Sequence, residues 1–120
     1  MAIQRFEDII AWQKAQDLAY QIYLEFNNLR DFGFRDQIRR AVVSISNNIA
    51  EGFDRRTDAD FSRFIYYAIG SCSEEKSMLY LAARLNYIET EKSRIVIEQT
   101  IEISKISHGL IKTLSKNNVS

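Results

Sequence analysis

The sequence contains no proline, only four glycines and a single cysteine among its 120 residues. Helix interiors exclude proline and disfavour glycine, so the scarcity of both residue types favours long helices. The single cysteine, Cys72, excludes an internal disulfide and any metal site built from several cysteines. These absences predict an all-α fold.

The sequence also lacks an excess of charge of either sign and any long apolar run. It has 16 basic and 16 acidic residues, whereas a dedicated nucleic-acid binder usually carries a strong basic excess. No apolar run approaches the ~20 residues that a membrane-spanning helix needs. The first residues lack the basic-then-apolar order of a secretory signal. We therefore expect a cytoplasmic protein with no membrane partner.

The sequence does contain a hydrophobic pattern of helical period. Apolar residues recur at steps of three and four in four segments, as in helices that bury one face. This pattern predicts helices over residues 8–26, 34–52, 58–85 and 90–114. Gly52 is expected to cap the second helix with a positive φ, and Thr57 and Thr90 to cap the starts of the next two. Because the connections are short, we predict one domain, residues 1–120, folded as an antiparallel up-and-down four-helix bundle.

Several segments resemble a known family. Residues 6–15 are FEDIIAWQKA, residues 37–52 are QIRRAVVSISNNIAEG, and the third predicted helix has a matching pattern over 61–65, 68–71 and Glu74. These segments resemble the four-helix-bundle proteins encoded within 23S ribosomal RNA intervening sequences, and the related accessory variability proteins of diversity-generating retroelements. The resemblance implies a bundle that often assembles as a five-subunit ring. The retroelement branch implies binding to a reverse transcriptase and to nucleic acid, and the intervening-sequence branch implies no established activity.

A polar row follows the apolar face of the second predicted helix. Its members lie at steps of three and four, and Glu74 of the third helix joins them: Gln37, Arg40, Ser44, Asn48, Glu51 and Glu74. One interpretation is a partly buried hydrogen-bond network, because buried polar groups need partners. The alternative is an ordinary boundary row. We predict the network, with Arg40 meeting a carboxylate and with Asn48, Glu51 and Glu74 substantially buried as well.

The third predicted helix carries more apolar surface than one bundle core requires. A second strip lies roughly 100–140° around the helix from its core face and consists of Tyr67, Ser71, Met78, Leu81 and Leu85. Extra apolar surface often marks an interface. The alternative is that these side chains only cover their neighbours. We predict a homo-oligomer assembled through the second and third helices, and the resemblance suggests a homopentamer.

Arginines form the only concentration of positive charge. The candidate nucleic-acid contacts are Arg39, Arg55, Arg56 and Arg63. Arg39 and Arg55 would lie ~24 Å apart along a continuous helix, and acidic residues are interspersed with them. Phosphate binding needs a contiguous positive surface, which a single copy does not offer, although a ring would gather several Arg55–Arg56 loops. The pattern favours solvated charges.

The residues that catalysis and metal binding require are scarce. The only histidine, His108, has no carboxylate three residues before it, so the ligands of a di-iron bundle are missing. There is no glycine-rich phosphate loop and no metalloprotease motif. Glu75 is directed towards the core, where a lone carboxylate is costly, and the pattern leaves open whether it is paired, escapes at the rim or lies in a differently wound turn. We expect no enzyme activity, no cofactor, no metal and no small-molecule substrate.

Two hypotheses for the function follow. The first is a non-enzymatic oligomeric bundle that acts as an interaction scaffold. The second is a nucleic-acid-associated accessory protein that binds RNA, DNA or a reverse transcriptase. Zero net charge favours the first hypothesis, and the family resemblance supports the second.

Overall fold

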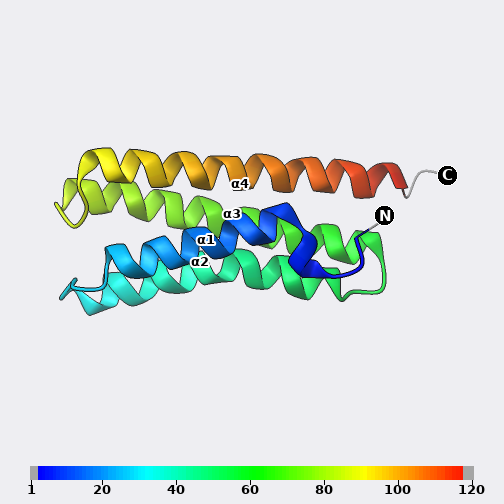
Figure 1. The fold of residues 1–120 in the computed structure, drawn as a ribbon, viewed down its shortest axis with the longest axis horizontal. Coiled ribbons are helices and arrows are strands. Elements are labelled where there is room, and N and C mark those ends of the chain that lie inside the picture. Colours follow the sequence, from blue (N-terminus) through cyan, green and yellow to red (C-terminus); the bar gives the residue numbers. More distant parts are fainter. Residues whose placement is uncertain (1–2, 118–120) are drawn as a thin grey trace.

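Four long helices run alternately up and down along one axis (Figure 1). The computed structural model describes residues 3–117, which form a three-ten helix η1 (Phe6–Asp8) and the α-helices α1 (Ile10–Glu25), α2 (Phe32–Phe53), α3 (Asp58–Arg84) and α4 (Thr90–Asn117). Each α-helix contacts its two neighbours, and α4 closes the ring of contacts against α1. The molecule measures 51 × 20 × 19 Å. The predicted all-α four-helix bundle is confirmed, residues 3–117 contain no strand, and residues 1–2 and 118–120 of the predicted domain lie outside the described part.

Side chains at helical spacing form the core between the four helices. In α2 the buried residues Ile38, Val42, Ile45 and Ile49 follow steps of four, three and four. Burying one such side chain contributes about 1.5–3 kcal/mol relative to leaving it exposed. The other helices contribute equivalent rows, with large, almost fully buried members Leu18, Ile22, Ile65, Leu79, Ile103 and Leu114. The apolar periodicity of the sequence therefore locates the core faces.

Side-chain caps determine where α2 and α3 begin. The Asp31 carboxylate accepts a hydrogen bond from the backbone N–H of Phe34 at 3.1 Å, so α2 begins two residues before the predicted start. The Thr57 hydroxyl oxygen accepts from the N–H of Asp60 at 3.1 Å. Each cap satisfies a donor that the first turn of a helix leaves without an internal partner. The predicted cap at Thr57 is confirmed.

Other helix ends differ from the predictions by a few residues. Thr90 is the first residue of α4 and not its cap, because the N–H of Ser93 already donates to the carbonyl oxygen of Glu89 at 2.9 Å. The same helix continues beyond the predicted end at 114 to Asn117. At the other end of the chain, the predicted single helix from residue 8 is divided, because η1 precedes a helix that begins at Ile10.

Gly52 lies inside α2, which continues to Phe53, and no glycine among residues 3–117 has a positive φ. Its predicted role as a C-terminal cap is therefore wrong. Its lack of a side chain instead allows α3 to approach, because a Cβ at this position would lie 2.6 Å from Cβ of Phe64 and 3.0 Å from Cδ1 of Phe61. The positive φ occurs at Asn86, with φ 60°, in the turn after α3.

Candidate functional site

An open groove of about 600 Å³ follows the outer side of α2 where this helix borders α3. Its lining combines side chains of α2 with Glu74 of α3. We call it the polar groove, and its residues are Gln37, Arg40, Ala41, Val43, Ser44, Asn47, Asn48, Glu51 and Glu74. All six residues of the predicted network line this groove. The helical spacing therefore identified residues that the fold does bring together.

Hydrogen bonds at the centre of the polar groove connect α2 to α3. The Ser71 hydroxyl of α3 donates to the Ser44 hydroxyl oxygen of α2 at 2.9 Å. The Asn48 amide nitrogen donates to the same hydroxyl oxygen at 3.0 Å and to the Ser44 carbonyl oxygen at 2.8 Å. These three side chains are half-buried. Ser44 is thus the centre of a small hydrogen-bond network between the two helices.

The charged members of the predicted network are not buried in the single chain. Arg40, Glu51 and Glu74 are exposed, as is Gln37, and Arg40 forms no ion pair within the described residues. The predicted burial of these charges, and the ion pair of Arg40 within one chain, are wrong. The physical reason is the helical angle, because Arg40 lies about 160° around α2 from the core row centred on Ile38, at about 100° per residue.

This exposure leads to a prediction about stability. We expect Arg40→Ala and Glu51→Ala each to change the free energy of unfolding of the monomer by no more than about 0.5 kcal/mol, the range of ordinary surface substitutions. Urea unfolding at a concentration where the protein is monomeric measures this. A loss of about 3–5 kcal/mol, the usual cost of stranding one partner of a buried ion pair, would contradict the exposed placement.

An apolar strip on α3 borders the polar groove. Tyr67 is 50% exposed, Leu81 46% and Leu85 45%, while Ser71 and Met78 are half-buried. The strip and the groove are continuous, because Ser71 donates to Ser44 within the groove. We call the polar groove and these five residues together the α2–α3 face. Three large apolar residues of the strip therefore remain about half exposed in the single chain.

The candidate nucleic-acid contacts separate into two places. The guanidinium carbon of Arg55 lies 4.4 Å from the centre of the Phe64 ring, and that of Arg63 lies 5.6 Å from it. Arg63 also forms an ion pair with Asp60 at 3.4 Å. Arg56 follows Arg55 in the same exposed loop after α2, whereas Arg39 lies elsewhere, stacked on the Tyr23 ring of α1 at 4.5 Å.

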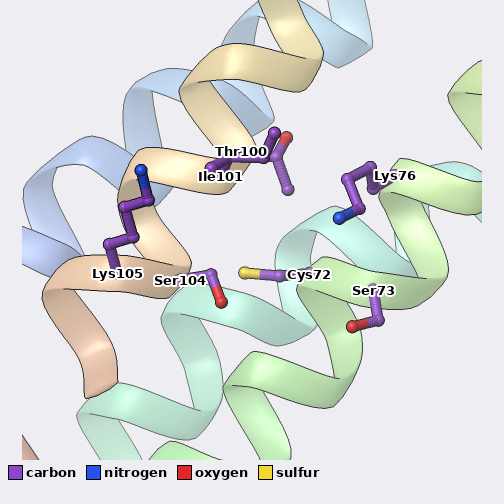
Figure 2. Close-up of a pocket in the computed structure, with 7 residues that line it drawn as sticks. All are labelled: Cys72, Ser73, Lys76, Thr100, Ile101, Ser104 and Lys105. Carbon is purple, nitrogen blue, oxygen red and sulfur yellow. The ribbon is translucent and has the colours of Figure 1, made fainter.

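A small pocket between α3 and α4 offers little chemistry (Figure 2). Its volume is about 100 Å³, and its lining consists of Cys72, Ser73, Lys76, Thr100, Ile101, Ser104 and Lys105. Burial, together with the nearby Glu75 carboxylate, raises the pKa of the Cys72 thiol to about 12, so the nucleophilic thiolate does not form near neutral pH. Residues 3–117 contain no group of three or more histidine, cysteine or acidic side chains that could hold a metal ion.

Glu75 is the residue that the sequence pattern placed in the core without assigning it a partner. The structure buries it completely, and the Thr100 hydroxyl of α4 lies 2.8 Å from its Oε1. The helical pattern of the sequence does not by itself identify Thr100 as the partner of Glu75. The feature that could have identified Thr100 is that it is a polar residue at a core position of α4, in the same row as Val96 and Ile103.

Comparison with known proteins places this arrangement in a family. The family model described as 23S rRNA-intervening sequence protein matches residues 7–109. The chain belongs to this family. The matched range includes all of α2 and α3, and therefore the whole α2–α3 face of this 23S rRNA-intervening sequence protein.

A solved structure shows the same fold. It is described as a protein of unknown function from the S23 ribosomal protein family of Bacteroides thetaiotaomicron VPI-5482. It is 28% identical to this 23S rRNA-intervening sequence protein and superimposes with a TM-score of 0.80, covering 86% of this chain and 99% of the other. The search of curated proteins found no match. Within residues 3–117, no helix is both long and apolar enough to cross a membrane.

Proposed function

We propose that this 23S rRNA-intervening sequence protein is a non-enzymatic scaffold that associates with copies of itself through the α2–α3 face. The observation that carries the proposal is the composition of this face. Large apolar side chains that are 45–50% exposed lie beside a groove whose arginine and carboxylates form no ion pairs within the described chain. The scaffold needs no cofactor and no small-molecule substrate.

A second copy of the chain supplies what this face lacks. Arg40 lies on α2 and Glu74 on α3, so Arg40 of one copy can pair with Glu74 of the next where the α2 side of one meets the α3 side of the other. The same contact removes Leu81 from water. Burial of apolar surface contributes roughly 25 cal/mol per Å², and the charges fix the register more than they add affinity.

Contacts between two different sides of a subunit lead to a ring. Such head-to-tail contacts close when the rotation between subunits allows it. The family resemblance suggests five subunits. In this arrangement α1 and α4 face outwards, and they also contact each other on the side of the bundle away from α2 and α3.

The experiment is light scattering on the purified protein and on a Met78→Asp, Leu81→Asp double variant. We expect an oligomer for the wild type at tens of micromolar and a monomer for the variant, because buried carboxylates without partners oppose association. The matched control is Leu24→Asp, since Leu24 is 59% exposed on α1 and outside the proposed contact. A monomeric wild type, or an oligomer that persists in the double variant, would refute the proposed interface.

A second candidate function is nucleic-acid association as an accessory protein, with RNA, DNA or a reverse transcriptase as partner. It is favoured by one observation, the position of the Arg55 and Arg63 guanidinium groups 4.4 and 5.6 Å from the centre of the Phe64 ring, which itself contacts Tyr67 at 5.5 Å between ring centres. Arginines beside aromatic rings suit single-stranded nucleic acid. In a ring, this cluster would repeat at the edge of every subunit contact.

Salt-dependent RNA binding distinguishes the two functions. If the cluster binds phosphate, affinity falls steeply as salt is raised, and an Arg55→Ala, Arg63→Ala variant both weakens binding and reduces the salt slope. Arg84→Ala at the opposite end of α3 is the control for loss of an exposed arginine. Absence of salt-dependent binding to RNA by the oligomer would leave the scaffold as the function.

A further inference from the structure

Glu75 is a carboxylic acid inside an otherwise almost apolar core. Its side chain is 0% exposed, and the buried residues of α1 and α2 include no ionisable group. On α4 the buried polar residues are Ser93, Thr100 and Ser107, which are hydroxyls. Cys72 is the only other buried ionisable side chain within residues 3–117. Nothing among the described core residues therefore neutralises a charge on Glu75.

The hydrogen bonds around Glu75 show which form of the acid fits. Thr100 Oγ1 lies 2.8 Å from Glu75 Oε1 and 2.9 Å from the carbonyl oxygen of Val96. A threonine hydroxyl has one proton to donate, and both of these neighbours are acceptors if Glu75 is ionised. If Glu75 is protonated, its O–H donates to Thr100 Oγ1 while the threonine O–H donates to Val96. Only the protonated acid satisfies both short contacts.

The second carboxyl oxygen supports the same assignment. Glu75 Oε2 is buried without a hydrogen-bond partner among the described residues. If Glu75 is neutral, its unpaired oxygen costs about as much free energy as one lost hydrogen bond. If Glu75 is ionised, that oxygen carries about half of a buried negative charge without a partner, which costs far more.

We infer that Glu75 is held as a neutral acid in the folded chain and, with Thr100 and Val96, forms a latch between α3 and α4 that opens when the acid loses its proton. Thr100 also lines the small pocket in Figure 2. Its volume of about 100 Å³ has room for a few water molecules. Opening the latch at Thr100 would connect Glu75 to this water, which would then solvate the carboxylate.

The charged groups of each helix near this region are exposed, except Lys76, which is half-buried. On α1, Lys14 is paired with Glu102 of α4 at 2.8 Å. On α3 and α4, Lys76 and Lys105 line the small pocket, and the described core residues of α2 contribute no charge. Consistent with the hydrogen-bond geometry, burial raises the pKa of Glu75 to about 7, and a hydrogen bond that Thr100 would donate to the ionised carboxylate opposes this rise only in part.

The direction of the pH effect follows from proton binding. The folded chain holds a proton on Glu75 up to about pH 7, whereas the unfolded chain releases it near its ordinary pKa of 4.5. The stability that protonated Glu75 provides is therefore complete below pH 4.5 and is lost as pH rises to about 7. Among the described groups with clearly altered pKa values, Asp31 and Glu91 are lowered, Tyr87 and Arg94 are raised from already high values and Cys72 lies at about 12, so Glu75 is the one whose pKa is shifted into the range between pH 5 and pH 8.

The experiment compares denaturant unfolding of the wild type and Glu75→Gln at pH 5 and pH 8, at one protein concentration. For the wild type we expect the unfolding equilibrium constant to be on the order of a hundredfold larger at pH 8. In Glu75→Gln the amide can donate to Thr100 as the neutral acid does but cannot ionise, so this difference should disappear. Equal pH dependence in both proteins would overturn the inference.

Two measurements on the wild type make the test independent of how the variant folds. The chemical shift of the Glu75 carboxyl carbon should titrate near pH 7. Amide hydrogen exchange around Thr100, corrected for intrinsic rates, should accelerate between pH 6 and pH 8 more than exchange in α2 does. Titration of Glu75 near pH 4.5 would overturn the neutral acid, and unchanged relative exchange would overturn the latch.

Discussion

Gly52→Ala should lower the free energy of unfolding by about 3 kcal/mol, at the upper end of typical overpacking costs. The added Cβ would lie 2.6 Å from Cβ of Phe64 and 3.3 Å from the carbonyl oxygen of Phe61. Neither atom can move by a change of rotamer, because both are fixed by the backbone of α3. The two helices must therefore separate locally, which weakens the packing of the ends of α2 and α3.

The matched control is Gly109→Ala in α4. A Cβ at Gly109 meets nothing within 4 Å, and the residue is exposed. Alanine is the better helix former, so this change should raise stability by about 0.5–1 kcal/mol. Denaturant unfolding followed by far-UV circular dichroism measures the change in the free energy of unfolding for both substitutions. If the two substitutions have the same sign, close approach at Gly52 is not the reason for glycine there.

Phe26→Ala should lower the free energy of unfolding by about 3–5 kcal/mol, the usual range for removing a buried phenylalanine ring. Phe26 follows α1 and is 0% exposed. Its ring lies 6.0 Å from that of Phe34, which lies 5.2 Å from that of Tyr87. The Tyr87 hydroxyl donates to Asp31 at 2.7 Å, so the cluster connects the turn between α1 and α2 to the turn between α3 and α4.

Tyr20→Ala in α1, the helix that Phe26 follows, is the control, because Tyr20 is 68% exposed. This substitution should change the free energy of unfolding by no more than about 0.5 kcal/mol, as most surface substitutions do. Thermal melts of the two variants at equal protein concentration would compare them directly. A loss for Phe26→Ala no larger than that for Tyr20→Ala would show that the aromatic cluster does not stabilise this end of the bundle.

The polar groove shows which properties of a surface can be predicted from the spacing of residues in the sequence. Steps of three and four correctly placed Arg40, Ser44 and Glu51 on one side of α2, because residues at this spacing share a helix face. The exposure of Arg40 follows from its angle on α2, but the half-burial of Ser44 was not predictable from spacing. It depends on where α3 lies, and α3 covers Ser44, which accepts from Ser71, while leaving Arg40 exposed.

Glu75 and Gly52 show two ways in which a local pattern is insufficient. The helical repeat correctly directed Glu75 towards the core but did not identify Thr100, which is 25 residues away in sequence. Gly52 near a predicted helix end suggested a cap, since glycine is common there. Its actual reason is the approach of a neighbouring helix, which no property of the second helix alone reveals.

By itself, the sequence determined the all-α class, the four helices and the faces that form the core, together with the family resemblance. Helical periodicity and the absence of proline are local properties, and local spacing decides which side chains share a face. Only the tertiary structure decided which of those faces are covered, why residue 52 is glycine, and which hydroxyl meets the buried acid. These features depend on distances between helices that are remote in sequence, and such distances are determined by how all four helices pack together.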